Sequence, residues 1–143
     1  MALLFYDDTK STFGASKLRT FHDGQLGGGF ESLIYLRNDN PANYYTSVSV
    51  SFEAELYNDT GPFGTSGWSV KFIYGERQPT EAEWDSVTAG EVVTIPDIGT
   101  TLATDTHTYH PIWVRVYAPG ESAAQIRENQ RVKVSAFERK VGA

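Results

Sequence analysis

The chain has 143 residues, which is enough for one domain with a substantial hydrophobic core. It contains no cysteine, and this excludes disulfide bonds and thiolate zinc sites. Its formal net charge is -6 at pH 7 and it has no dense basic run, so we expect no nucleic-acid partner, because phosphate contacts dominate that kind of affinity.

The beginning of the chain, MALLFYDD, has an apolar run that is too short for a signal peptide or a membrane span. We therefore expect a soluble protein that is made in the cytoplasm and has no membrane partner. Residues 1–16 are interpreted as an N-terminal strand and arm, with the first strand from Ala2 to Tyr6. Residues 17–143 form the main body of what we expect to be a single domain.

Strand patterns dominate the rest of the chain, in keeping with an aromatic content of 13% and 13 glycines. The clearest one begins at Tyr44, where Val48, Val50 and Phe52 alternate with serines, as in a strand with one buried face. Strands are predicted wherever apolar and polar residues alternate or turn signals bound a short run. These strands are Lys17–Phe21, Phe30–Arg37, Tyr44–Tyr57, Trp68–Tyr74, Glu91–Ile95, His110–Tyr117 and Arg131–Glu138.

The strand HPIWVRVYAPG has a stop at each end, because proline suits a first strand position and Ala-Pro-Gly is typical of a turn. Its core face is aliphatic. Its second face carries Trp113, Arg115 and Tyr117, and it either packs under loops or meets another molecule.

One helical turn is predicted near residues 80–87. Thr80 and Glu83 have the spacing of a capping box, and Trp84 then lies against the edge of the sheet. Two other local signals stand out. Asn38-Asp39-Asn40-Pro41 ends a strand by capping its own backbone, and Gly27–Gly29 is either a flexible connector or a backbone in close contact with a neighbour.

Seven or eight strands with one helical turn predict an all-β fold, a single-domain antiparallel β-sandwich that is Ig-like or jelly-roll-like. An open barrel is the alternative. The loops at 58–67 and 99–110 are expected at the ends of the sandwich, where a rigid scaffold presents them.

The sequence offers little for catalysis. His107 and His110 are three residues apart, and on a strand this spacing places them on opposite faces, so they are interpreted as surface histidines. The acidic pairs, such as Asp7-Asp8, lack the calcium-loop pattern, and Glu53 and Glu55 are interpreted as residues of a solvated face. We therefore expect no enzyme activity, no metal and no cofactor.

The tryptophans support two interpretations. Trp68, Trp84 and Trp113, together with tyrosines, fit a sugar-stacking platform of a carbohydrate-binding module. Tryptophans in a small sandwich are more often core residues or anchors of subunit contacts, and we favour that interpretation.

A resemblance to accessory structural proteins of tailed bacteriophage virions is carried by LIYLRNDNPANYYTSVSV, GERQPTEAEW and HPIWVRVYAPG. Within these stretches it depends on Leu36-Arg37-Asn38, Tyr44-Tyr45-Thr46, Pro79-Thr80 with Glu83-Trp84, and Trp113-Val114-Arg115-Val116. The resemblance implies a virion component without catalysis, repeated in symmetric contact with other subunits. A capsid decoration (cement) protein is the first expectation, and a tail, neck or baseplate module is the alternative.

The expected partners are the major capsid protein or other virion proteins, and further copies of the chain in a homo-oligomer. The arm Met1–Lys10 and the loop Asn58–Gly67 are expected to make lateral or capsid contacts. The candidate interface residues are Phe5, Tyr6, Tyr44, Tyr45, Phe63, Trp113, Arg115 and Tyr117.

Overall fold

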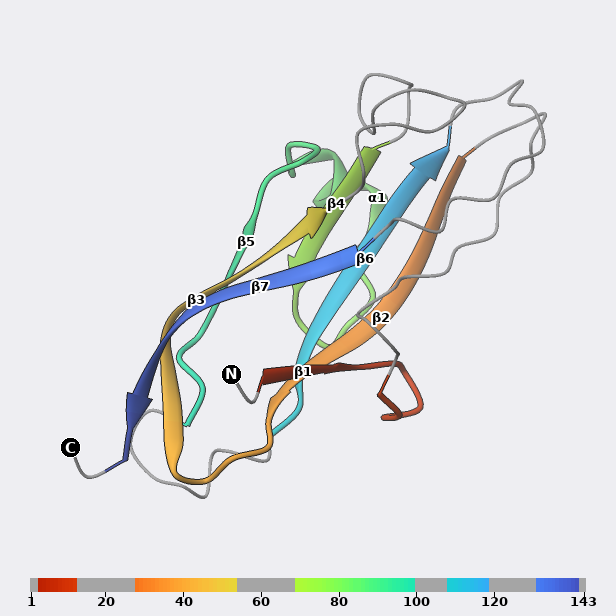
Figure 1. Cartoon of the computed structure of the whole chain (residues 1–143). Coiled ribbons are helices and arrows are strands. Elements are labelled where there is room, and N and C mark those ends of the chain that lie inside the picture. The colour runs from red at the N-terminus through yellow and green to blue at the C-terminus, as the bar shows by residue number, and fades with distance from the viewer. Residues whose placement is uncertain (1–2, 13–27, 54–68, 100–107, 119–130, 142–143) are drawn as a thin grey trace.

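The computed structural model describes residues 3–12, 28–53, 69–99, 108–118 and 131–141 (Figure 1). Within these ranges the elements are β1 (Leu3–Tyr6), β2 (Gly28–Asn38), β3 (Asn43–Glu53), β4 (Ser69–Tyr74), α1 (Glu81–Asp85), β5 (Val93–Ile95), β6 (His110–Ala118) and β7 (Arg131–Lys140). The predicted strand Lys17–Phe21, the loop Asn58–Gly67 and the end of the strand predicted to reach Tyr57 lie outside the described residues.

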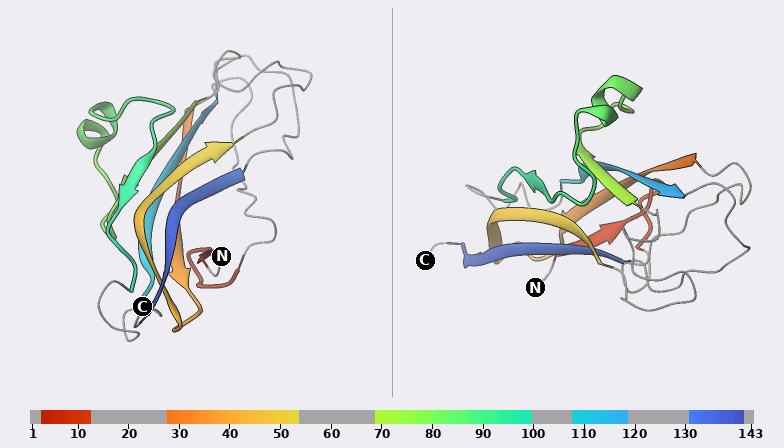
Figure 2. Two further views of the ribbon diagram at one scale, coloured as in Figure 1. Left: turned by 60° about the vertical axis from the view of Figure 1, so that its left-hand side comes forward. Right: turned by 90° about the horizontal axis from the view of Figure 1, so that it is seen from above.

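The strands form two antiparallel sheets that pack face to face as a β-sandwich, which confirms the predicted fold class (Figure 1). Sheet A has the order β1-β2-β6-β4, and sheet B has the order β5-β3-β7. The helix α1 lies against the face of sheet A that points away from sheet B (Figure 2). The sandwich therefore has an outer face on each sheet, and α1 covers part of only one of them.

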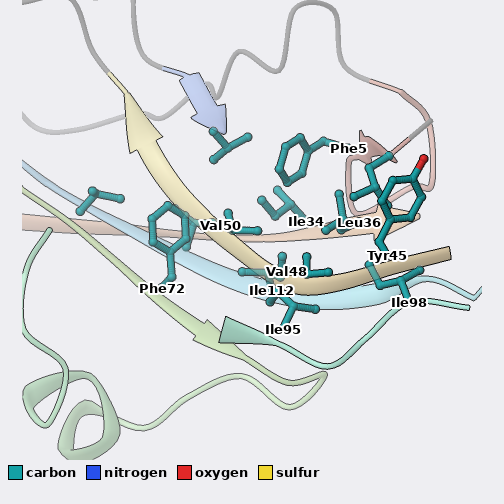
Figure 3. Packing of buried hydrophobic residues seen from close by; sticks show 14 of the residues in the cluster. Phe5, Ile34, Leu36, Tyr45, Val48, Val50, Phe72, Ile95, Ile98 and Ile112 are labelled. Atoms are coloured by element: carbon teal, nitrogen blue, oxygen red, sulfur yellow. The ribbon is translucent and has the colours of Figure 1, made fainter. Parts of the chain in front are cut away.

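The core between the sheets is aliphatic in its centre and aromatic toward its ends (Figure 3). Ile112, Val114 and Val116 of β6 are fully buried, as the alternation in HPIWVRVYAPG predicted. The other described members of the core are Leu3, Phe5, Ile34, Leu36, Tyr45, Val48, Val50, Val70, Phe72, Ile95, Ile98 and Val132.

A β-bulge in β3 changes which side chains face the core. The register with β7 shifts between Thr46 and Ser49, and Ser47 takes a positive φ of 52°. The extra residue restarts the alternation, so Tyr45 on one side and Val48 on the other are both fully buried. Tyr45 is thus a core residue, and its hydroxyl donates a hydrogen bond to Glu138 Oε1 at 2.7 Å.

The turn between β2 and β3 is closed by the side chain of an Asx residue, as the sequence predicted. Asn38 is fully buried, its side-chain oxygen accepts from the Asn40 backbone N–H at 2.9 Å, and its Nδ2 donates to the Asn43 carbonyl at 2.9 Å. The buried amide thus has partners on both sides, which avoids the penalty of an unsatisfied polar group. This turn carries the chain from sheet A to sheet B.

Candidate interaction surfaces

The single helical turn α1 forms because its N-terminus is capped. Thr80 Oγ1 accepts from the Glu83 N–H, and the Glu83 carboxylate accepts from the Thr80 N–H at 3.1 Å, which is the predicted capping box. Arg77 binds both carboxylate oxygens of Glu83, at 2.8 and 2.9 Å. The hydrogen bond from Thr80 and the neighbouring guanidinium lower the pKa of Glu83 below its ordinary value. A helix this short therefore depends on its cap and on what it packs against.

The helix-covered patch, which we define as Glu31, Lys71, Glu81, Trp84 and Arg115, lies on the outer face of sheet A. Trp84 is fully buried there, and its indole N–H donates to Glu31 Oε1 at 2.6 Å. Lys71 Nζ donates to the Trp84 carbonyl at 3.0 Å, and Arg115 pairs with Glu81 at 3.0 Å. Contacts to β2, β4 and β6 thus hold α1 on the sheet.

Gly29 leaves room for the Arg115 side chain on this face. A Cβ at position 29 would overlap Arg115 Nε, so only a residue without a side chain fits while Arg115 keeps its place. Of the two interpretations of Gly27–Gly29, the close backbone approach is the one that Gly29 fits. Gly28 and Gly29 belong to β2 rather than to a connector.

The second face of β6 shows both predicted environments: some of its side chains pack against the chain itself, and one is open to another molecule. Trp113 is half-buried and its indole N–H donates to the Glu76 carbonyl at 3.1 Å, while Arg115 is held under α1. Tyr117 is exposed. Among the predicted interface residues of β6, only Tyr117 therefore presents an open ring to the solvent.

A second cluster on the outer face of sheet A, the tyrosine cluster, consists of Tyr6, Tyr35 and Tyr109 with the cations Lys10 and Arg37. The Tyr109 ring meets Tyr6 and Tyr35 edge-on, with centroids 5.3 and 5.6 Å away. Lys10 Nζ and Arg37 Cζ lie 5.0 and 4.9 Å from the Tyr109 centroid, within the range of cation–π attraction. The cluster fastens residues 3–12 of the predicted arm onto the sheet.

Tyr6 is the buried anchor of this cluster. Its hydroxyl donates to Asp39 Oδ2 at 2.6 Å, and Asp39 also pairs with Arg37 at 3.2 Å. The hydrogen bond to the carboxylate and burial raise the pKa of Tyr6 above its ordinary value. The Tyr6 hydroxyl is therefore a neutral hydrogen-bond donor that holds together two parts of the same chain. Tyr6, one of the predicted interface residues, is buried, so its ring is not open to a partner in this structure.

The outer face of sheet B is different, because β3 and β7 display polar and cationic side chains there with one large apolar group. Phe137 of β7 is 64% exposed. It lies opposite Thr46 in the register, and Arg139, opposite Tyr44, donates to Thr46 Oγ1 at 3.1 Å. Tyr44 is half-buried. The alternation of the last strand carries the signal for Phe137, because every second residue from Val132 to Ala136 faces the core and position 137 falls on the opposite face, but Phe137 was not among the predicted interface residues.

Two more of the predicted interface residues need correction. Phe5 and Tyr45 are core residues, because the β1 pairing turns Phe5 inward and the bulge at Ser47 turns Tyr45 inward. Phe63 lies outside the described residues. The structure therefore does not bring the seven described candidates together, and it leaves Tyr44 half-exposed on sheet B and Tyr117 exposed on sheet A.

No group of three or more potential metal ligands occurs among the described residues. His110 lies at the start of β6, where its Nδ1 is 3.4 Å from the Tyr74 hydroxyl, and His107 is outside the described ranges. Asp7 acts as a turn residue: its Oδ1 accepts from the Thr9 hydroxyl and from the N–H groups of Ser11 and Thr9, and these bonds lower its pKa.

Of the three tryptophans proposed for a sugar platform, Trp84 is buried and Trp113 is bound to a backbone carbonyl, while Trp68 is outside the described residues. None of the helices in the described part of the chain has the length and apolar character to cross a membrane. No protein-family model matches the chain, and neither the curated proteins nor the solved structures compared with it give a significant match.

Proposed function

We propose that this chain is a non-enzymatic structural protein of a tailed-phage virion, and that it stabilises the particle by contacts between subunits. The capsid surface is its proposed place. The sequence resemblance supports the phage origin, and the rigid sandwich with side chains turned outward supports a role in contacts. The chain is thus proposed to bind neighbouring subunits and hold them together.

The observation that carries the proposal is Phe137, which is 64% exposed in the middle of a regular strand. Isolated apolar side chains on a surface are common, but Phe137 is the most exposed large hydrophobic residue in the part of the chain that the structure describes. Trp84, Trp113 and most of the tyrosines described in sheet A already have partners in the chain. A neighbour that covers Phe137 would bury apolar area at low entropic loss, since the strand is already ordered.

The test is the location and copy number of the chain in particles. Quantitative mass spectrometry of purified virions, separated into heads and tails, should find many copies per head. Added recombinant chain should co-sediment with heads that lack it. Phe137→Ser should weaken this binding by about tenfold or more, and Val141→Ser, which replaces another exposed apolar residue, should not. Absence of the chain from particles would refute the proposal, and recovery in the tail fraction would replace the capsid by a tail or neck position.

A further inference from the structure

The charges of the chain are strongly separated along the sequence. Four of the ten residues of β7 are basic and one is acidic, which leaves the strand at +3: Arg131, Lys133, Arg139 and Lys140 against Glu138. The stretch from 76 to 97 has one basic and six acidic residues, which leaves it at -5: Arg77 against Glu76, Glu81, Glu83, Asp85, Glu91 and Asp97. One third of the 12 basic residues of the chain are therefore in one strand of an acidic protein.

The fold places these two charged stretches on opposite sides of the molecule. β7 and β5 are the two edge strands of sheet B, with β3 between them. The acidic stretch contains α1 and β5, and it is tied to β4, the edge of sheet A, by the hydrogen bond from the Gly90 N–H to the Val70 carbonyl at 2.9 Å. Figure 2 shows α1 and β5 together on the side away from β7. We call these the basic edge (β7) and the acidic edge (β5 with its flanks and α1).

Several charges at each edge are available to a neighbour. Lys133 and Lys140 are exposed, and neither has a carboxylate partner among the residues that the structure describes. Glu138, the one acid of β7, is already engaged as an acceptor by Tyr45 and Asn43. On the other side, Glu91 and Asp97 flank β5 and are exposed, again without a cationic partner in the described ranges.

Each edge also presents an apolar side chain. The two most exposed large hydrophobic residues in the described part of the chain are Phe137 at 64% and Val92 at 58%. Phe137 belongs to the basic edge, and Val92 directly precedes β5 at the acidic edge. An apolar contact surrounded by opposite charges is the usual composition of a specific protein interface.

We propose that copies of this chain associate head to tail, with the basic edge of one copy against the acidic edge of the next. A two-fold contact through β7 would place the cations of two copies side by side, and a two-fold contact through the acidic edge would do the same with carboxylates. Like charges at such contacts are unfavourable. Only the head-to-tail arrangement pairs Lys133 and Lys140 with the carboxylates around β5 and lets Phe137 meet Val92.

A head-to-tail contact uses two different patches on each copy, so it closes into a ring or continues as a row. This inference rests on the proposed structural role, where repeated copies cover a surface. Because exposed charges form much of the contact, association should weaken with increasing salt. The basic strand also has an alternative occupant, an acidic polymer or another acidic protein, and a wild type that stays monomeric in the experiment below favours it over a second copy.

A charge-swap experiment on the full chain tests the arrangement. The first variant, Lys133→Glu with Lys140→Glu, brings β7 from +3 to -1. The second variant, Glu91→Lys with Asp97→Lys, reverses the charges that flank β5. Sedimentation velocity at low ionic strength measures self-association of the wild type, of each variant, and of an equimolar mixture. Each variant alone should associate at least about tenfold more weakly than the wild type, and the mixture should recover most of the loss.

The mixture is informative because its two components are complementary only across a head-to-tail contact. Circular dichroism and thermal unfolding of each variant serve as the folding control, since all four side chains are exposed. A wild type that stays monomeric up to about 1 mM overturns the inference, as does stronger association of the β7 variant alone, which indicates a two-fold contact. Loss of association that the mixture does not rescue also overturns it, because complementary edges would restore the contact. A monomeric chain that still co-sediments with heads would remove the lateral contact and leave the proposed function intact.

Discussion

Trp84 offers the sharpest test of how the outer face of sheet A is held. Its side chain is fully buried although it lies outside the core between the sheets. A tryptophan side chain buries about 200 Å². At about 25 cal/mol per Å² this gives an upper value of about 5 kcal/mol, and Trp→Ala substitutions at buried sites measure about 3–5 kcal/mol. We expect Trp84→Ala to lower the free energy of unfolding by about 3–4 kcal/mol.

The hydrogen bond to Glu31 can be separated from the packing. Trp84→Phe keeps most of the ring but removes the N–H that Glu31 Oε1 accepts at 2.6 Å. A hydrogen bond to a charged group contributes about 1.5–3 kcal/mol, and we expect a loss in that range. The matched control is Trp113→Phe, whose indole donates to the neutral Glu76 carbonyl at 3.1 Å on a half-buried site. Its loss should be smaller, about 1 kcal/mol.

Urea unfolding followed by far-ultraviolet circular dichroism measures these values, since removing an indole would disturb a fluorescence signal. A double-mutant cycle with Glu31→Gln should give a coupling energy of at least about 1 kcal/mol between the two side chains. The reasoning is refuted if Trp84→Ala costs less than about 1 kcal/mol with an unchanged m-value. That result would mean that α1 detaches before global unfolding, and hydrogen exchange would then show its amides opening independently.

Three further changes test the bulge, the tyrosine cluster and the cap. Ser47→Gly should raise the free energy of unfolding by up to about 1 kcal/mol, because glycine accepts a φ of 52° without strain, whereas Ser49→Gly in the same strand should lower it by about 0.5–1 kcal/mol. Tyr6→Phe removes the bond to Asp39 and should cost about 1.5–3 kcal/mol. Because the pKa of Tyr6 is raised in the folded state, this advantage is complete below about pH 10 and shrinks as the pH rises through the folded value. The pKa of Glu83 is lowered, so the advantage of the wild type over Glu83→Gln is complete above about pH 4.3 and disappears as the pH falls through the folded value.

Chemical denaturation at a series of pH values measures all three. Equal effects of glycine at positions 47 and 49 would contradict the assignment of the bulge. A Tyr6→Phe difference that stays constant from pH 8 to pH 11 would contradict a raised tyrosine pKa, and a wild type that gains stability relative to Glu83→Gln as the pH falls would contradict the depressed pKa of the carboxylate.

Local chemistry explains which parts of the fold could be predicted from the sequence. Thr80 and Glu83 specify their capping box within four residues, and Asn38 closes its turn with atoms two and five residues away. Periodicity also identified the core face of β6, because every second residue from Ile112 to Val116 is aliphatic and β-branched.

What could not be predicted depends on contacts between distant segments or on a shift of one residue. Ser-Val-Ser alternates in the same way with or without a bulge, so nothing local indicated that Ser47 would turn Tyr45 into the core. Trp84 and Glu31 are 53 residues apart, and only the packing of α1 on sheet A brings them together. The burial of Phe5 and Tyr6, two of the predicted interface residues, could not be predicted for the same reason, since the pairing of β1 with β2 determines their environment.

If the chain assembles as we propose, folding and assembly use different side chains. On the outer face of sheet A, Trp84 and the tyrosine cluster pack against other residues of the same chain. Substitutions there should therefore change the free energy of unfolding. Sheet B leaves Phe137 and the lysines of β7 exposed, so substitutions there should act on association. The charge reversal Lys133→Glu with Lys140→Glu should therefore leave the unfolding midpoint within about 0.5 kcal/mol of the wild type while it weakens self-association. Trp84→Phe should lower the free energy of unfolding and leave self-association unchanged at temperatures where the variant remains folded. A variant of either kind that changed both properties together would show that the two faces are coupled through the core, and would contradict this separation.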